Sequence, residues 1–173
     1  MARFVELRRH TDNDGDVLTA EGVRAALDIG RRLSGDYHVL VSTGAQRATQ
    51  TLACFLAALG QRVPAGVVVE PGLRSGVEDR WREAYHKAGS GDLAALGSVA
   101  PELVNQDSAT LGAALGRVLE ALPEGGRALV VGHSPTNEAA VLGLTGQIVP
   151  AMAKGAGVVV AADDQGFRIE AGH

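Results

Sequence analysis

Short apolar runs alternate along this chain with stretches in which apolar residues recur every three or four positions. The short runs are rich in Val and Leu and are bounded by Gly, Ser, Pro or charged residues, which is typical of buried strands. They predict buried strands at 4–7, 39–41, 67–69 and 128–131. Because strands that alternate with helices form parallel sheets covered on both faces, we expect an α/β fold: a three-layer sandwich with a largely parallel central sheet.

The intervening stretches predict amphipathic helices. The first covers 19–33, and Thr19 can cap its N-terminus. The second ends at Gly60, and the third lies before the last of these strands. Their apolar positions follow helical spacing, at Leu52, Phe55, Leu56 and Leu59 in the second helix and at Leu111, Leu115, Val118 and Leu122 in the third.

Two further segments complete the expected architecture. The apolar runs at 158–161 and 167–169 are joined by the polar turn residues 163–166, which predicts a C-terminal antiparallel hairpin. The segment 72–105 is polar and short of apolar periodicity, so we expect it to be irregular and to form a lid or rim. No linker or repeat divides the chain, and we expect residues 1–173 to form a single domain.

Composition and charge narrow the class of protein. Hydrophobic residues make up 46% of the 173 residues and charged residues 21%, so the chain can bury a core. A net charge of −4 argues against nucleic acid or an anionic membrane as the partner. The single cysteine, Cys54, excludes an internal disulfide, and its apolar neighbours predict a buried thiol. No stretch approaches the roughly 18 apolar residues of a membrane span and no signal peptide is evident, so we expect a cytoplasmic protein.

Reactive side chains follow each of the predicted parallel strands. In open α/β sheets, ligands bind outside the carboxyl ends of the strands, so we expect these side chains to converge on one edge of the sheet. They are Arg9 and His10 after the first strand, Ser42, Thr43 and Arg47 after the second, Glu70, Arg74, Glu78 and Asp79 after the third, and His133 and Ser134 after the fourth.

This set of residues predicts a phosphate site. Arginine presents a planar cationic fork that matches phosphate oxygens, and helices that begin near Arg47 and Ser134 would add backbone N–H groups. A histidine between cations should have a lowered pKa, which leaves a ring nitrogen free to attack phosphorus. By contrast, Arg8 should point away from Arg9 and be solvated. The other histidines, His38, His86 and His173, are expected to be structural or solvated.

Competing motifs are incomplete. The Gly132–Thr136 segment begins like a serine hydrolase nucleophile elbow around Ser134, but Thr136 replaces its final glycine. The Asp12–Asp16 segment looks like a calcium loop, but its glycine is misplaced and Val23 stands where a bidentate glutamate is needed. No P-loop motif is present. A metal site on the two histidines would place a cation among arginines, so we expect no metal and no cofactor.

Four ordered segments resemble the histidine phosphatase superfamily, which has the phosphoglycerate-mutase-like fold. They are the strand end at 7–11, the helix opening at 16–22, the segment 42–51, and the Gly-His-Ser at 132–134. By this resemblance, His10 would be the nucleophile that becomes phosphohistidine. Arg9, Arg47 and His133 would bind the phosphoryl oxygens, and water would then hydrolyse the phosphoenzyme. The resemblance implies a phosphatase that needs no metal.

The chain also departs from the family pattern. Thr11 stands where glycine is common and Gly44 where proline is frequent. Ser75 stands where many members carry the carboxylate that acts as general acid. Glu78, or else Asp79, could supply a proton from a shifted loop.

The substrate classes that remain are a phosphorylated small molecule and a phosphohistidine protein. Small members of the family that act on phosphohistidine lack the acid, and a mutase would usually carry longer insertions. The alternative to a phosphatase is a non-catalytic phosphate-binding or scaffold protein with the same fold.

Overall fold

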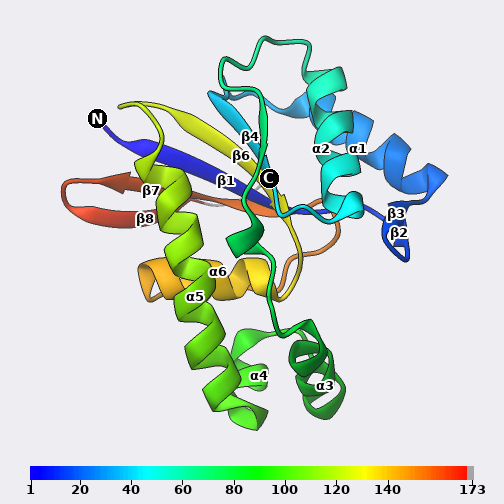
Figure 1. The fold of residues 1–173 in the computed structure, drawn as a ribbon, viewed down its shortest axis with the longest axis vertical. Helices are drawn as coiled ribbons and strands as arrows, with labels where there is room; N and C mark the ends of the chain where they lie inside the picture. Colours follow the sequence, from blue (N-terminus) through cyan, green and yellow to red (C-terminus); the bar gives the residue numbers. More distant parts are fainter. Residues whose placement is uncertain (171–173) are drawn as a thin grey trace.

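A computed structural model describes residues 1–170, and a six-stranded sheet forms its centre (Figure 1). The strand order is β5-β4-β6-β1-β7-β8. β4 lies parallel to β5 and β6, and β6 lies parallel to β1, whereas β7 is antiparallel to both β1 and β8. The predicted largely parallel sheet and the C-terminal hairpin are therefore confirmed. The strands are β1 (Arg3–Arg9), β4 (Val39–Ser42), β5 (Val67–Val69), β6 (Arg127–Gly132), β7 (Gly157–Asp163) and β8 (Gly166–Glu170).

Helices cover both faces of the sheet, as the alternation of elements predicts. Alternate residues of β6 pack into two separate hydrophobic clusters: Leu129 and Val131 into one with α1 and α2, and Val130 into the other with α5 and α6. This alternation is the pleat of a strand that is buried on both sides. The helices are α1 (Ala20–Arg32), α2 (Gln46–Leu59), α3 (Glu78–Ala88), α4 (Leu93–Val99), α5 (Pro101–Glu120) and α6 (Thr136–Thr145).

The predicted helix boundaries are largely confirmed. Thr19 caps α1 by accepting a hydrogen bond from the Gly22 amide at 3.0 Å. α2 ends at Gly60, whose φ of 65° lies in the left-handed region that favours glycine. α5 and α6 pack so closely that their backbones are in contact. A Cβ atom on Gly143 would lie 1.7 Å from the carbonyl oxygen of Ser108, so this position requires glycine. None of the helices within residues 1–170 has the length and apolarity that a membrane span requires.

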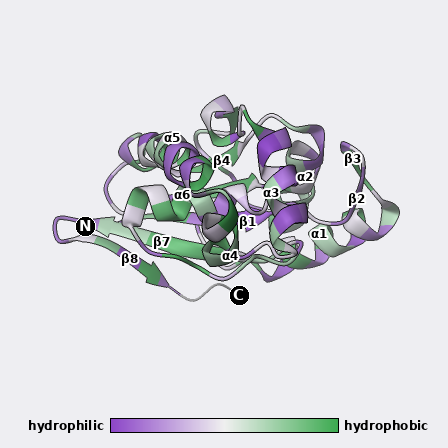
Figure 2. Ribbon diagram, turned by 90° about the horizontal axis from the view of Figure 1, so that it is seen from below, coloured by the Kyte–Doolittle hydropathy of each residue, from purple (hydrophilic) through white to green (hydrophobic). Residues whose placement is uncertain are grey.

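The expectation of an irregular segment at 72–105 is wrong. It contains a short 3₁₀ turn (Pro71–Leu73), α3, α4 and the start of α5, and α3 and α4 extend away from the sheet at the bottom of Figure 1. α3 is mostly hydrophilic in Figure 2 and buries only Trp81 and Ala84, and α4 buries only Leu93 and Leu96. Such narrow apolar stripes are too sparse to register as helical periodicity.

Three burial expectations also need correction. β5 is an edge strand, and its valines are 41–57% exposed, because β4 alone pairs with it within residues 1–170. Cys54 is half-buried rather than buried, and partial burial raises the pKa of its thiol. Arg8 points away from the site but is only 7% exposed. Its Nε donates to Glu6 at 2.7 Å, so it belongs to a buried ion pair and not to the solvated surface.

Besides the main sheet, a small hairpin projects from the end of β1. It consists of β2 (Asn13–Asp14) and β3 (Val17–Leu18), and it lies beside α2 at the right of Figure 1. Gln50 of α2 accepts a hydrogen bond from the Leu18 amide at 2.8 Å, which ties the hairpin to the helix. The connection places Asp16 in the turn next to the N-terminus of α2.

Candidate active site

His10 lies immediately after β1, at the carboxyl end of the strand, and its side chain is buried. Its Nδ1 lies 2.8 Å from the carbonyl oxygen of Thr11. Because a carbonyl oxygen only accepts, Nδ1 must carry the proton. In the neutral ring, Nε2 therefore has a free lone pair. This is the tautomer that a nucleophilic histidine needs.

The surroundings of His10 favour its neutral form. Burial lowers the pKa of the ring, and the hydrogen bond to the Thr11 carbonyl opposes this only in part. The charges of Arg47, Arg9 and Lys154 lower the pKa further. His10 is thus uncharged at neutral pH, in accord with the expectation for a histidine between cations.

His133 follows β6 and stands edge-on to His10, with ring centroids 5.4 Å apart. Its Nε2 lies 2.8 Å from the hydroxyl oxygen of Thr43, while its Nδ1 is buried and has no hydrogen-bond partner among residues 1–170. Burial, together with the charge of Arg47, lowers the pKa of His133 to about 3. If the Thr43 hydroxyl donates to Nε2, the neutral ring carries its proton on Nδ1 and can donate it to an anion.

Two arginines flank the histidines. Arg9 donates from Nη1 to the carbonyl oxygen of Met152 at 3.0 Å, and its Nε is buried without a hydrogen-bond partner in the described part of the chain. Arg47 lies in the first turn of α2 and donates from Nη1 to Asp16 at 2.8 Å. The structure therefore brings together His10, His133, Arg9 and Arg47, which the sequence places at three different strand ends.

Asp16 was not predicted as a site residue, because in the sequence it stands in a segment that resembles an incomplete calcium loop. Its Oδ1 accepts from both the guanidinium and the backbone amide of Arg47. Burial alone would raise the pKa of Asp16, but the hydrogen bonds from the amides of Arg47 and Gln46 and from the guanidinium outweigh it and lower the pKa. Asp16 is half-exposed and forms an ion pair with Arg47, the arginine that a phosphate would contact.

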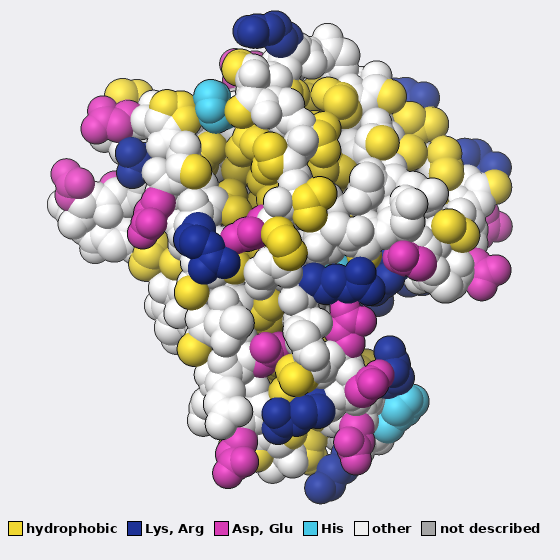
Figure 3. Space-filling model, viewed as in Figure 1, with side chains coloured by type: hydrophobic (Ala, Val, Ile, Leu, Met, Phe, Trp, Pro, Cys, Tyr) yellow, Lys and Arg dark blue, Asp and Glu magenta, His cyan; other side chains and the backbone are white. Residues whose placement is uncertain are grey.

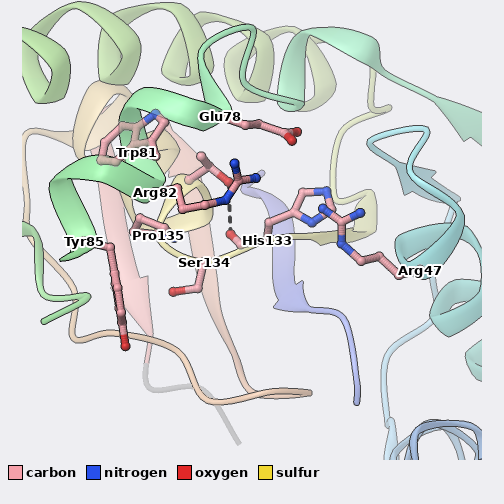
Figure 4. A pocket seen from close by; sticks show the side chains of 9 residues that line it. Arg47, Glu78, Trp81, Arg82, Tyr85, His133, Ser134 and Pro135 are labelled. Atoms are coloured by element: carbon pink, nitrogen blue, oxygen red, sulfur yellow. Dashed lines mark hydrogen bonds between the residues drawn. The ribbon is translucent and has the colours of Figure 1, made fainter. Parts of the chain in front are cut away.

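A cavity of about 240 Å³ opens beside His133 and Arg47. Figure 3 shows the surface hollowed between the main body and the lobe that contains α3, with charged side chains at the mouth. In Figure 4, Trp81 and Tyr85 of α3 lie with Pro135 on one side of the cavity, and Arg47 lies on the opposite side. A phosphate at the histidine pair would leave this space for the group attached to it. The remaining lining residues are Glu78, Arg82, Ser134 and Thr136.

The structure separates the two candidate acids. Glu78 begins α3 and lines the cavity, where its Oε1 accepts from Arg74 at 2.8 Å. Asp79 is outside this lining; its side chain is 93% exposed and pairs with Arg82. Ser75 is buried and donates to Asp107, which also accepts from Trp81. Ser75 thus holds α3 in place and is unavailable to a ligand.

The other predicted polar residues have structural positions. Ser42 is buried and hydrogen-bonded to Thr49 of α2. His38 is half-buried at the opposite end of β4, and His86 is exposed on α3. His173 lies outside the described residues. Glu138, which was not predicted as a site residue, is completely buried in α6 behind Ser134.

Comparison with solved structures identifies the fold. Phosphoglycerate mutase from Bacillus anthracis str. Sterne superposes with a TM-score of 0.75 at 16% identity, covering 98% of this chain and 92% of that one. The protein histidine phosphatase SixA complexed with tungstate gives a TM-score of 0.61 at 22% identity, covering 99% and 96%. A mycobacterial glucosyl-3-phosphoglycerate phosphatase gives 0.66 at 17%, covering 98% and 97%. No protein-family model and no curated protein sequence matches the chain.

These similarities establish the fold of the phosphoglycerate-mutase-like histidine phosphatases. The resemblance seen in the four sequence segments is therefore confirmed at the level of the fold. Structures of small phosphohistidine phosphatases are among those that match. At identities of 16–22%, a shared fold does not assign roles to individual residues.

Proposed function

We propose that this protein is a phosphatase that acts through a covalent phosphohistidine at His10. The observation that carries the proposal is the hydrogen bond from Nδ1 of His10 to the Thr11 carbonyl, which leaves Nε2 as a nucleophile. The lowered pKa of His10 keeps that nitrogen unprotonated at neutral pH. A ring in the other tautomer, or a charged ring, would have no lone pair to offer at this position.

The residues around His10 suit the binding of a phosphoryl group. Arg47 and Arg9 supply positive charge. Nε of Arg9 and Nδ1 of His133 have no hydrogen-bond partner within residues 1–170, and Nδ1 can donate when the Thr43 hydroxyl donates to Nε2. Donors that are fixed before the reaction stabilise the charge that develops on phosphoryl oxygens, which is the main requirement of phosphoryl transfer. The SixA structure contains tungstate, a tetrahedral oxyanion, and this supports an oxyanion site in a protein of the same fold.

The reaction would take place in two steps. First, Nε2 of His10 attacks phosphorus and the bond from phosphorus to the leaving group breaks, with Arg9, Arg47 and His133 holding the phosphoryl oxygens. Second, water attacks the phosphohistidine and releases inorganic phosphate, which restores the neutral ring. This chain's own residues supply the nucleophile and the charge for both steps.

The substrate would be a phosphorylated small molecule or a phosphohistidine side chain of another protein. The cavity of about 240 Å³ accommodates a small leaving group, and Trp81, Tyr85 and Pro135 give it an apolar wall. The SixA structures among the structural neighbours support a phosphohistidine side chain of a protein as the substrate.

Hydrolysis of p-nitrophenyl phosphate and phosphoramidate, measured in the presence of a chelator, tests the proposal. We expect turnover that is inhibited by vanadate and lost by several orders of magnitude in His10→Ala. His38→Ala is the matched control, since His38 lies at the other end of β4. Absence of turnover in the wild type, with phosphate still bound, would instead support a non-catalytic phosphate-binding protein.

A further inference from the structure

Glu138 is an unusual residue to find completely buried. It lies in α6, one turn after Ser134, and its side chain is 0% exposed. One carboxyl oxygen accepts a hydrogen bond from the Ser134 hydroxyl, and the other, Oε1, has no hydrogen-bond partner within residues 1–170. An ionised carboxylate that is buried without a cation partner is very costly, so the site favours a carboxyl group that keeps its proton.

The electrostatics of the site agree with this conclusion. Burial raises the pKa of Glu138. The hydrogen bond from Ser134, the backbone amides of Glu138 and Met152 and the positive charge of Arg9 oppose the shift without cancelling it. A protonated Glu138 donates to the Ser134 oxygen. The same contact is then reversed, and the hydroxyl proton of Ser134 becomes free to point elsewhere.

Ser134 is placed to use that proton. It follows His133 directly in the chain and lines the cavity together with His133 and Arg47 (Figure 4). The cavity is the space that the group attached to the phosphate would occupy. A hydroxyl there, with a buried acid behind it, can serve a leaving group that is too basic to depart as an anion.

We propose that Ser134 and Glu138 form a proton relay in which Ser134 protonates the leaving group and Glu138 replaces the proton. This inference rests on the proposed phosphatase function and assigns its acid. Ser134 would be the catalytic residue, because it touches the leaving oxygen. Glu138 would be the buried proton source that acts through it.

The protons that the relay gives up in the first step are restored in the second. As the bond between phosphorus and the leaving oxygen breaks and the bond to Nε2 of His10 forms, that oxygen takes the Ser134 hydroxyl proton and Ser134 takes the Glu138 proton. In the second step, water attacks phosphorus and one of its protons returns through Ser134 to Glu138. No other acid or co-reactant is needed.

Glu78 is the rival acid, and the two sites differ in a way that can be measured. Glu78 is partly exposed, and Arg74 already occupies one of its oxygens. An acid that protonates the leaving group matters most when that group is a poor one. The loss of kcat/KM caused by a substitution should therefore depend on the acidity of the leaving alcohol only if the substituted residue takes part in protonating the leaving group.

The experiment compares Ser134→Ala, Glu138→Gln and Glu78→Gln on aryl and alkyl phosphates that span a wide range of leaving-group acidity. For alkyl phosphates we expect kcat/KM to fall by about 100-fold or more in Ser134→Ala and Glu138→Gln, a typical contribution of general acid catalysis. The loss should shrink steadily as the leaving group becomes more acidic, and the double variant should lose little more than either single variant. Ser98→Ala, an exposed serine on α4, is the control.

Two results would overturn the relay. A loss in Glu138→Gln and Ser134→Ala that is equal for all leaving groups would show a purely structural role. A dependence on the leaving group in Glu78→Gln, but not in Ser134→Ala, would assign the acid to Glu78. If the relay fails while p-nitrophenyl phosphate turnover is still lost in His10→Ala, the proposed phosphatase stands and only its acid is wrong. Should Glu138→Gln fail to fold, Ser134→Ala decides the question alone.

Discussion

The ring of His133 stands edge-on to the ring of His10, with centroids 5.4 Å apart, and each ring makes one hydrogen bond, through Nδ1 in His10 and through Nε2 in His133. His10 is held through Nδ1 by the Thr11 carbonyl, and His133 through Nε2 by the Thr43 hydroxyl. The first leaves a lone pair on Nε2 of His10. When the Thr43 hydroxyl donates, the second leaves the proton of His133 on Nδ1. Two chemically identical side chains thereby gain the different properties that a nucleophile and an anion ligand need.

The lowered pKa of His133 predicts a dependence of stability on pH. Its pKa is about 3 in the folded protein against an ordinary value of 6.5. Between these values the unfolded chain binds a proton that the folded protein does not, so stability falls as the pH drops below 6.5. From His133 alone, we expect the free energy of unfolding to decrease by about 2 kcal/mol between about pH 6.5 and pH 5.

Urea denaturation in phosphate-free buffer at the two pH values measures this difference. His133→Asn removes the titrating ring, and the difference between its pH dependence and that of the wild type reports the contribution of His133 together with its coupling to His10. The same pH dependence in both proteins would show that His133 is not held neutral.

Removal of Arg47 should weaken binding of the transition state. Its guanidinium is fixed at the start of α2 next to both histidines. We expect Arg47→Ala to cost roughly 2–4 kcal/mol in kcat/KM, the range for one preorganised donor. Arg24→Ala, on the exposed side of α1, is the matched control for loss of charge. A loss below about tenfold would mean that Arg47 does not contact the phosphoryl group.

Asp16 should oppose anion binding. Its carboxylate pairs with Arg47 at 2.8 Å and would compete with a phosphate for that guanidinium. Asp16→Asn keeps an oxygen acceptor for Arg47 but removes the negative charge. We expect inhibition by inorganic phosphate to tighten by up to about fivefold, as for a partly exposed charge pair. Weaker phosphate binding in Asp16→Asn would indicate that Asp16 chiefly orients Arg47.

The buried pair of Arg8 and Glu6 should contribute to stability and not to catalysis. Glu6 accepts from Arg8 and, at 2.7 Å, from the Tyr37 hydroxyl, on the side of β1 away from Arg9. Glu6→Ala would leave the Arg8 guanidinium buried without its counter-charge, which typically costs about 3–5 kcal/mol. Chemical denaturation measures this loss. Turnover per folded molecule should stay at the wild-type level, and a selective loss of turnover would place this pair in the active site.

The sequence predicted the elements whose apolar pattern is strong. The alternating burial of Leu129, Val130 and Val131 in β6 and the Thr19 cap of α1 follow from local rules, and they are confirmed. The valines of β5 were expected to be buried, because a short apolar run does not reveal that its strand lies at the edge of a sheet. α3 was missed because Trp81 and Ala84 give it too narrow an apolar stripe.

The residues of the candidate site likewise divide into those that the sequence predicts and those that it does not. His10, His133, Arg9 and Arg47 could be predicted because each follows a strand whose position the pattern indicates. Asp16 reaches Arg47 only through the fold of the β2–β3 hairpin, which no local rule places. Glu138 follows Ser134 at the spacing of one helical turn, and that spacing could have suggested a contact. Its complete burial, which favours the protonated form of the carboxyl group, depends on the packing of α6 against the sheet and α5.

Trapping of the phosphoenzyme tests the central claim most directly. The protein is mixed with a labelled phosphoramidate or aryl phosphate, quenched in alkali, and mapped by mass spectrometry under conditions that preserve phosphohistidine. We predict a phosphoryl group on His10 that is stable in alkali, labile in acid and absent from His10→Ala. Turnover without a label on His10, or a label on another residue such as Ser134, would contradict the account.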